Sequence, residues 1–191
     1  KIFNIVVLNY LNKLGTSNSI EKVEEIETLI NNFDLTKFSK SSVFFDSNEI
    51  ERLNSKYIKD LDFEIVKENY NSEFNDFFWK IIRSNVDTID DAQEWYNLFN
   101  QDFEIPKRII LEKNLKSLIL KSVPDNVDLT FWSKWTENIL KNYDIKPKNL
   151  YITLREILTG KKFGPSMNEL LTLMNKDEII KRVETNCEEK N

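Results

Sequence analysis

The sequence predicts an all-α protein. Its 191 residues include three glycines and four prolines, far fewer turn-forming residues than sheets and barrels need. Apolar residues recur at three- and four-residue intervals along most of the chain, which is the pattern of amphipathic helices. Hydrophobic residues make up 40% and charged residues 31% of the chain, a balance typical of soluble proteins that bury a core. We therefore expect helices packed around a hydrophobic core.

Five helices are predicted in the first half of the chain. The first ends at Gly15, because glycine adopts the left-handed conformation that closes a helix. Asp46, with Glu49, and Thr88 are expected to cap the third and fifth, since their side-chain oxygens can accept hydrogen bonds from free backbone N–H groups. A short extended piece, residues 43–45, precedes the third. The predicted helices cover residues 3–14, 20–33, 46–61, 66–82 and 88–99.

Five more helices are predicted in the second half. Pro106 opens the first and Pro147 the third, because proline fits the first turn of a helix. Asp128 is expected to cap the second. Residues 188–191 are expected to fray at the end of the chain. The predicted helices lie in residues 106–119, 128–143, 147–159, 166–173 and 179–183.

Residues 150–174 contain the strongest helix-breaking signals in the chain. Gly160 is expected to end one helix, and Ser166 with Glu169 forms Ser-x-x-Glu, a capping box that starts the next. Between them lies a tight basic corner, residues 161–165, which ends in a Gly-Pro pair. In a chain this poor in glycine and proline, such a corner indicates a specific requirement of packing or function.

The residue types exclude several kinds of site. The chain has no histidine and one cysteine, Cys187. It therefore has no internal disulfide, no cysteine-based metal site and no nucleophile assisted by histidine. Three glycines cannot form a glycine-rich phosphate loop. A carboxylate- or lysine-based enzyme stays open, although no pair of acidic residues stands out as an acid and base. Cys187 is expected to be a thiol without a function.

Charge is distributed unevenly along the chain. The net charge of −5 argues against nonspecific binding of nucleic acid by the chain as a whole. Residues 106–121 and 146–162, however, each carry five basic residues against one acidic residue. The two segments either form one local basic patch or are separate solvated helix faces.

Neither a membrane segment nor a secretion signal is predicted. No apolar run approaches the roughly 20 residues that span a bilayer, and polar residues interrupt residues 2–14, unlike a signal peptide. We therefore expect a cytoplasmic protein that contacts no membrane. The sequence begins with Lys1 and not with Met, directly before a predicted helix, so we expect it to be a piece of a longer protein.

Residues 37–41, Lys-Phe-Ser-Lys-Ser, resemble the Lys-Met-Ser-Lys-Ser signature of class I aminoacyl-tRNA synthetases, whose lysines stabilise ATP phosphates. That use requires a nucleotide-binding parallel sheet upstream, whereas residues 1–36 predict two helices and no strand. We therefore interpret residues 37–41 as a polar loop between subdomains.

A longer resemblance begins at Leu150-Tyr-Ile-Thr-Leu-Arg155. Thr159-Gly160 follows after three residues and Gly164-Pro165 after three more. This order resembles the C-terminal anticodon-binding domain of bacterial glutamyl-tRNA synthetases, which reads L-x-x-x-L-R-x-x-L-T-G-x-x-x-G-P. The family continues with a leucine-rich helix and a helix that ends in lysine or arginine, and Leu170-Leu171 and Lys181-Arg182 fit that order.

The N-terminal third resembles the same family. Residues 8–15 read Leu-Asn-Tyr-Leu-Asn-Lys-Leu-Gly, which is similar to the family's L-N-Y-L-x-x-L-G, and residues 39–46 are similar to its S-K-S-P-A-x-F-D. Residues 33–35 and 53–58 are similar to its F-D-L and L-N-x-x-Y-I. The departures are Thr16 for a frequent tryptophan, Ser42 for a proline and Asn175 for a glycine. Residues 64–149 match in helical pattern alone.

The resemblance implies an organisation into modules. Members of the family are class I ligases that attach glutamate to tRNA with ATP and Mg²⁺, in an N-terminal Rossmann half that these residues do not resemble. Residues 1–63 would be a small, mostly helical stem-contact subdomain. Residues 64–191 would be the anticodon-binding domain, built from two consecutive helical bundles, residues 64–122 and 123–191. No cofactor is expected in this part of the ligase, which we expect to be inactive alone.

The resemblance also implies which residues contact RNA. Arg155 matches the family arginine that contacts an anticodon base, and Pro165 and Met167 match positions that pack against the anticodon bases. An unstacked base exposes edges that an arginine fork can bind. The family often carries an R-x-R pair before Asp-Thr, where this chain has Arg83 and then Asn85, so that base contact rests on Arg83. The expected phosphate contacts, which add affinity that falls with salt, are Lys161, Lys162, Lys107 and Arg108.

Besides a self-sufficient enzyme, for which the sequence offers no catalytic group, two functional hypotheses remain at this point. In the first, the chain is a monomeric tRNA-binding part of a glutamate–tRNA ligase that binds neither DNA nor membrane. Its partner is the tRNA of the glutamate type, the glutamine type or both. In the second, the chain is a helical protein-interaction or scaffold module without an RNA role, as its net acidity and aromatic stripes allow. At helical spacing, Trp132 and Trp135 are expected in the core.

Overall fold

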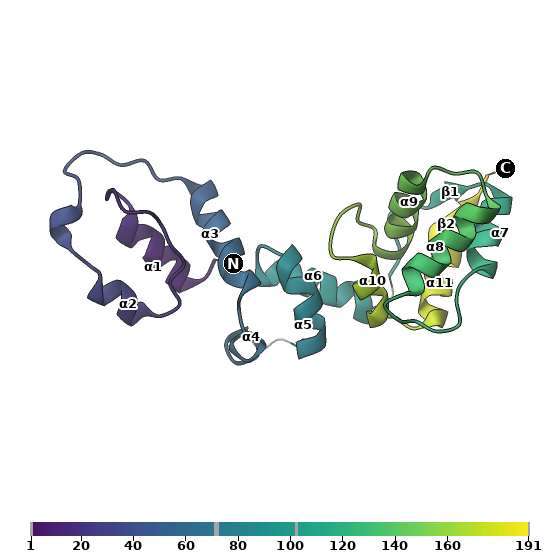
Figure 1. Ribbon diagram of the computed structural model, residues 1–191, viewed down its shortest axis with the longest axis horizontal. Helices are drawn as coiled ribbons and strands as arrows, with labels where there is room; N and C mark the ends of the chain where they lie inside the picture. Colours follow the sequence, from purple (N-terminus) through teal and green to yellow (C-terminus); the bar gives the residue numbers. More distant parts are fainter. Residues whose placement is uncertain (1, 71–72, 102, 191) are drawn as a thin grey trace. The chain divides into compact units, whose positions relative to one another are not determined.

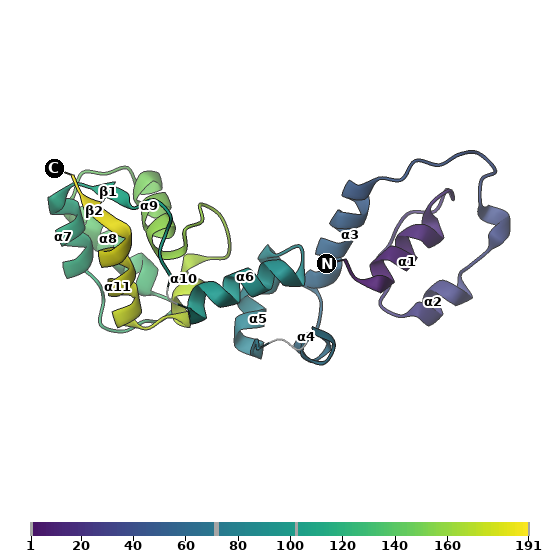
Figure 2. The same cartoon turned by 180° about the vertical axis from the view of Figure 1, so that it is seen from behind.

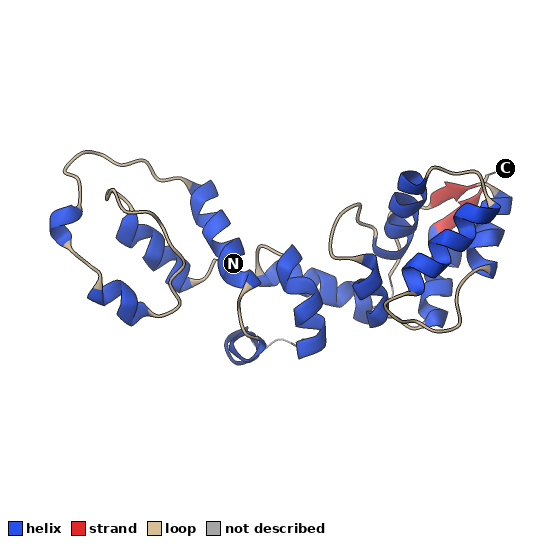
Figure 3. Ribbon diagram, in the orientation of Figure 1, coloured by secondary structure: helices blue, strands red, loops and turns tan. Residues whose placement is uncertain are grey.

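The prediction of an all-α fold is confirmed. The computed structural model describes residues 2–70, 73–101 and 103–190, in which eleven α-helices and three short 3₁₀ helices accompany one two-stranded sheet (Figure 3). The chain divides into two compact units, Lys1–Glu94 and Trp95–Asn191. The predicted division into residues 1–63, 64–122 and 123–191 stays a prediction, since a functional module need not end where packing is sparse.

The first unit contains five helices and two 3₁₀ turns (Figure 1). Helix α1 packs against α2 and α3, and the turn η2 packs against α3 and α5. Helix α6 (Ile89–Asn100) begins in this unit and continues into the second. The other elements are α1 (Asn4–Lys13), α2 (Ile26–Asn31), η1 (Leu35–Lys37), α3 (Ser47–Lys59), α4 (Phe63–Tyr70), α5 (Asp76–Ile82) and η2 (Arg83–Asn85).

Buried polar side chains connect the elements of the first unit. Asn54 on α3 accepts a hydrogen bond from the backbone N–H of Phe3 at 3.0 Å and donates one to the carbonyl of Asp87 at 2.7 Å. The indole N–H of buried Trp79 donates to the carbonyl of Leu61 at 2.9 Å. Because a buried polar group is costly without a partner, these hydrogen bonds favour the one arrangement in which the bonded segments lie side by side.

Two predicted helices of this unit are wrong in extent. Residues 20–25 form neither helix nor strand, and the helix begins at Ile26. The side chain of Asn9 donates to the carbonyl of Glu21 at 2.7 Å, which holds this segment beside α1 instead. The single helix predicted over residues 66–82 is two helices, because Asn75 caps a new one by accepting a bond from Phe78 N at 2.8 Å.

The predicted caps of α3 and α6 are confirmed. Asp46 accepts a hydrogen bond from Asn48 N at 2.9 Å, but its own N–H donates to the Tyr10 hydroxyl at 2.8 Å and not to Glu49, so the pairing with Glu49 is wrong. Thr88 Oγ1 accepts from Asp91 N at 3.1 Å while Asp91 accepts from Thr88 N at 2.8 Å, which is a reciprocal capping box. Residues 43–45 belong to no strand.

The second unit packs four longer helices around one core. Helix α8 contacts α7, α9 and α10, and α11 contacts α7 and α9. Trp135 lies at the centre, fully buried, and its indole N–H donates to the carbonyl of Ile119 at 3.0 Å. The elements are β1 (Ile109–Leu111), α7 (Lys113–Lys121), α8 (Phe131–Asn142), α9 (Pro147–Thr159), α10 (Met167–Leu170), η3 (Leu171–Leu173), α11 (Lys176–Asn186) and β2 (Cys187–Glu189).

The small parallel sheet of this unit corrects two predictions. Pro106 does not open a helix, because Ile109–Leu111 forms β1, which pairs with β2 with Ile109 opposite Cys187 (Figures 1 and 2). Residues 188–190 are not frayed, and Lys190 N donates to Leu111 O at 2.7 Å. β-branched residues favour a strand where a partner is available, and here the partner is the distant end of the chain. Asn191 lies outside the described residues.

The predicted cap at Asp128 is also displaced. Its side chain accepts hydrogen bonds from the backbone N–H and hydroxyl of Thr130, at 2.7 and 2.5 Å, in the turn before α8. These bonds lower the pKa of the Asp128 carboxyl. In the part of the chain that the structure describes, no helix is long and apolar enough to cross a membrane.

Candidate nucleic-acid interface

Helix α9 and the corner after it form the centre of the candidate site. Pro147 stands in the first turn of α9, and Gly160 ends the helix with a φ of 66° while its N–H donates to Glu156 O at 2.8 Å. Both helix signals were predicted from the sequence and are confirmed. Ser166 stands before α10 as predicted, but its hydroxyl makes no capping bond, so the capping box with Glu169 is wrong.

Contacts of both backbone and side-chain atoms hold this corner in place. Gly164 has a φ of 147°, and a Cβ there would lie 2.6 Å from the Trp95 ring, so the backbone lies directly on that ring. Thr159 Oγ1 donates to Arg155 O at 2.8 Å and accepts from Lys161 N at 3.2 Å. Lys161 Nζ lies 5.2 Å from the centre of the Trp95 ring, within range of a cation–π contact.

Arg155 spans the inside of the corner. Its Nη2 donates a hydrogen bond to the carbonyl oxygen of Pro165 at 2.9 Å. Nη1 is enclosed and makes no hydrogen bond with the described protein atoms. Burial lowers the pKa of Arg155, but a guanidinium stays protonated at neutral pH. The side chain therefore holds a positive charge and an unused donor at the corner.

A groove of about 290 Å³ opens beside Arg155. Asn168 also lines it, and its enclosed Oδ1 makes no hydrogen bond with the described protein atoms. Each of these two residues thus has one enclosed polar atom without a partner among the described protein atoms, and such an atom costs about 1–3 kcal/mol. A nucleobase edge carries both an acceptor and a donor, the two kinds of group that these atoms lack. The lining residues are Trp132, Tyr151, Ile152, Arg155, Lys162, Ser166, Met167 and Asn168.

Aromatic side chains form part of this groove. Trp132 on α8 and Tyr151 on α9 have ring centroids 5.9 Å apart. Trp132 was expected in the core together with Trp135, and that holds for Trp135 alone, since Trp132 is half-buried and lines the groove. Helical spacing could not separate the two, because the exposed edge of α8 depends on where α9 and α10 pack.

The structure brings together some of the predicted contacts. Arg155, Met167 and Lys162 line the groove. Pro165 is buried behind it and contributes its carbonyl to Arg155. Lys161 lies over Trp95 instead of in the groove lining. The roles predicted for these residues stay predictions.

The other predicted contacts lie elsewhere. Lys107 and Arg108 are exposed in the turn before β1, after a segment whose Phe103 and Ile105 pack against Gly160. Arg108 lies 3.6 Å from Glu188 in an exposed ion pair. Arg83 belongs to the first unit and donates to Leu61 O at 3.4 Å.

A buried arginine outside the groove holds the last turn of α9. Arg182 on α11 is 1% exposed, and its Nη1 donates to Leu158 O in the last turn of α9 at 2.6 Å. Its Nη2 donates to Leu98 O at 2.5 Å and its Nε to Glu178 at 2.7 Å. Burial lowers the pKa of Arg182, and Glu178 partly opposes that shift. The match of Lys181-Arg182 to a family pattern did not reveal that this arginine is a packing residue.

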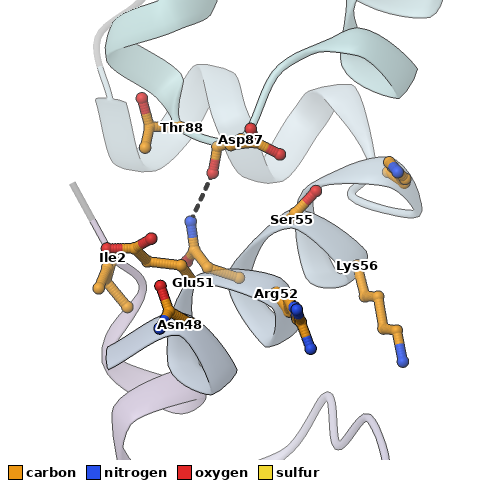
Figure 4. Close-up of a pocket in the computed structure, with 10 residues that line it drawn as sticks. Ile2, Asn48, Glu51, Arg52, Ser55, Lys56, Asp87 and Thr88 are labelled. Atoms are coloured by element: carbon orange, nitrogen blue, oxygen red, sulfur yellow. Dashed lines mark hydrogen bonds between the residues drawn. The ribbon is translucent and has the colours of Figure 1, made fainter. Parts of the chain in front are cut away.

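A second basic feature lies in the first unit. Arg52, Lys56 and Lys59 follow one another on one exposed face of α3, at spacings of four and three residues. They line a hollow of about 640 Å³ with Asp87 and Thr88 on the opposite side (Figure 4). This row was missed at the level of the sequence, because acidic residues, Glu51 and Asp60, stand directly before and after it in the chain. No cluster of three metal-ligating side chains occurs among the residues described.

Comparison with known proteins decides the family. Residues 35–187 match the family described as "Anticodon binding domain". The chain belongs to the anticodon-binding domain family. The resemblance predicted from the motifs around Arg155 is thereby confirmed.

Similar whole proteins are longer than this anticodon-binding chain. It is 34% identical over 185 residues to Glutamate–tRNA ligase 1 of Wolbachia pipientis subsp. Culex pipiens, a match that covers 96% of the chain and 41% of the ligase. It is 32% identical to Glutamate–tRNA ligase 1 of Rickettsia prowazekii, over 94% of the chain and 41% of the ligase. The chain thus spans about two-fifths of the length of these relatives.

Solved structures share the fold of the anticodon-binding chain. A glutamate tRNA ligase from Elizabethkingia meningosepticum superimposes with a TM-score of 0.70 at 16% identity, over 96% of this chain and 40% of that one. The glutamate-tRNA synthetase from Elizabethkingia anophelis gives a TM-score of 0.69 at 17% identity, with the same coverage.

Proposed function

We propose that this chain binds the anticodon loop of a tRNA of the glutamate type. The observation that carries the proposal is the groove at Arg155 in a chain of the anticodon-binding domain family. Arg155 and Asn168 line the groove with polar side chains suited to a base edge, Trp132 and Tyr151 offer aromatic faces, and Lys162 offers charge to a phosphate. The tRNA of the glutamine type is an alternative or additional partner.

We further propose that the parent protein is a glutamate–tRNA ligase that attaches glutamate to tRNA with ATP and Mg²⁺ in the cytoplasm. The ligases that match over most of this chain support the proposal. No residue of this chain is given a role in holding ATP or Mg²⁺ by that resemblance. The row of Arg52, Lys56 and Lys59 on α3 would supply phosphate contacts for the tRNA stem.

An exposed apolar surface supports a larger parent protein. It lies on and beside α1, α2 and η1 in the first unit, around a hollow of about 390 Å³. Exposed apolar patches mark surfaces that another protein part covers. Its exposed members are Leu8, Leu11, Ile26, Ile30, Phe33 and Leu35. The same surface would serve the alternative function, a protein-interaction module without an RNA role.

Binding of tRNA separates the two functions. The chain would be titrated with tRNAs of the glutamate type, the glutamine type and a third, unrelated type, at low and moderate salt. The proposal expects tighter binding of the glutamate type that persists at moderate salt. If the chain binds all three tRNAs alike and releases all of them as salt rises, its binding is nonspecific charge attraction. That result would favour the protein-interaction module.

A further inference from the structure

Phe163 has no packing role that explains its position. Its side chain is 85% exposed, the largest value among the big apolar side chains of the described residues. An aromatic ring left in water gives the fold none of the stabilisation that burial provides. A polar residue would therefore serve the fold at least as well, so the ring points to a role in contact with another molecule.

The backbone that presents Phe163 is held on both sides. The next residue, Gly164, lies against the Trp95 ring, and Arg155 holds Pro165 by the 2.9 Å hydrogen bond to its carbonyl. On the preceding side, Lys161 is bonded to Thr159 Oγ1. An exposed ring on a fixed loop loses less conformational freedom on binding than one on a loose loop.

The surroundings of Phe163 favour an anionic partner. Lys161 and Lys162 precede it directly, and Lys162 also lines the groove that contains Arg155. Among the ion pairs of the described residues, Lys162 takes part in one, in which its Nζ lies 3.6 Å from Oε1 of Glu156. An aromatic ring beside cations is the arrangement by which proteins stack on an unpaired base while they neutralise its phosphate.

We propose that Phe163 stacks on an unpaired base of the tRNA loop that occupies the groove. The proposal rests on the function proposed above and adds to it a base contact that Arg155 and Met167 do not make. It concerns the face of a base and not its edge, so Phe163 contributes affinity without reading sequence.

The test uses the whole chain and a short RNA hairpin with the anticodon arm of the glutamate tRNA. Phe163→Leu keeps an apolar side chain and removes the ring, whereas Phe163→Trp keeps an aromatic one. Phe44→Leu is the matched control, because Phe44 is 84% exposed and belongs to the first unit, outside the residues that line the groove. Circular dichroism would verify that all three variants fold.

We expect Phe163→Leu to raise the Kd about tenfold, as the loss of one base–aromatic stack does, with an unchanged salt slope. Phe163→Trp and Phe44→Leu should bind like the native chain. In hairpins carrying 2-aminopurine at one loop position after another, one position should lose its fluorescence on binding to the native chain and retain it with Phe163→Leu.

Three results would overturn the proposal in distinguishable ways. If Phe163→Leu binds and quenches like the native chain while Arg155→Ala binds weakly, stacking is wrong and the proposed function stands. If the native chain does not prefer this hairpin to one with an unrelated loop, the proposed function is wrong and the stacking with it. If Phe163→Leu weakens binding to anionic lipid vesicles and not to RNA, the ring contacts a membrane surface.

Discussion

Arg155 on α9 donates a hydrogen bond from Nη2 to the carbonyl oxygen of Pro165, at 2.9 Å across the corner. The side chain proposed to contact an anticodon base therefore also holds the loop beside that base. Its Nη1 is enclosed without a partner among the described protein atoms, and the residue lines the groove. One guanidinium can fill both roles because its donors point in fixed directions.

Replacement of Arg155 tests both roles. Arg155→Ala should weaken binding of the glutamate-type tRNA by about 1–3 kcal/mol, as expected for the loss of a base contact. Arg155→Lys should restore little, because an ammonium cannot bind the carbonyl and a base in the same planar geometry. Equilibrium binding to native tRNA and to tRNAs with a changed anticodon measures the effect.

Thr159→Val is the control for the structural role of Arg155. It removes the hydroxyl bonds to Lys161 and to the backbone carbonyl of Arg155 at nearly constant side-chain volume, and it leaves the guanidinium in place. We expect a smaller loss of affinity than for Arg155→Ala. Equal losses for the two variants, or an equal weakening of every tRNA by Arg155→Ala, would mean that Arg155 only shapes the corner.

The corner was predictable from the sequence because its signals are local. Pro147 acts on the first turn of α9 and Gly160 on the last, and neither effect depends on distant residues. Trp132 was misplaced because its exposure depends on neighbouring helices, and the β1–β2 pairing was missed because it joins Ile109 to Cys187 across the unit. Local sequence patterns thus located the candidate site, whereas the place of Trp132 in the groove lining depends on tertiary packing.

The phosphate role of Lys162 predicts a change in salt dependence. Lys162→Gln should reduce the slope of log K against log salt by about one unit, with little change in preference among tRNAs. Lys80→Gln is the control, because Lys80 is exposed on α5 in an ion pair with Asp76 and lies outside the proposed contacts. Unchanged slopes for both variants would remove Lys162 from the proposed set.

Buried Arg182 predicts a large effect on stability. Arg182→Met removes the hydrogen bonds to Leu158 O and Leu98 O and leaves Glu178 without its ion pair. We expect a loss of about 3–5 kcal/mol in the free energy of unfolding, measured by denaturant titration with tryptophan fluorescence. Exposed Lys181→Met should change it by less than about 0.5 kcal/mol. A loss below about 1 kcal/mol for Arg182→Met would mean that the packing around α9 relaxes without it.

Cys187 predicts a dependence of stability on alkaline pH. Its side chain is 3% exposed, and burial raises the pKa of the thiol to about 11 from 9.0. The folded chain therefore retains a proton that the unfolded chain releases between about pH 9 and 11. The free energy of unfolding should fall across that interval by up to about 2 kcal/mol from this group.

The measurement is the difference in the free energy of unfolding between the native chain and Cys187→Ala as pH rises, which cancels the titration of tyrosines and lysines. That difference should be constant below pH 8 and shrink as pH rises toward 11, since the variant has no thiol to ionise. At neutral pH the buried thiol should also react slowly with iodoacetamide, because the thiol and not the thiolate is present. A pH-independent difference, or rapid alkylation of the folded chain, would mean that Cys187 is more accessible than its packing beside β1 indicates.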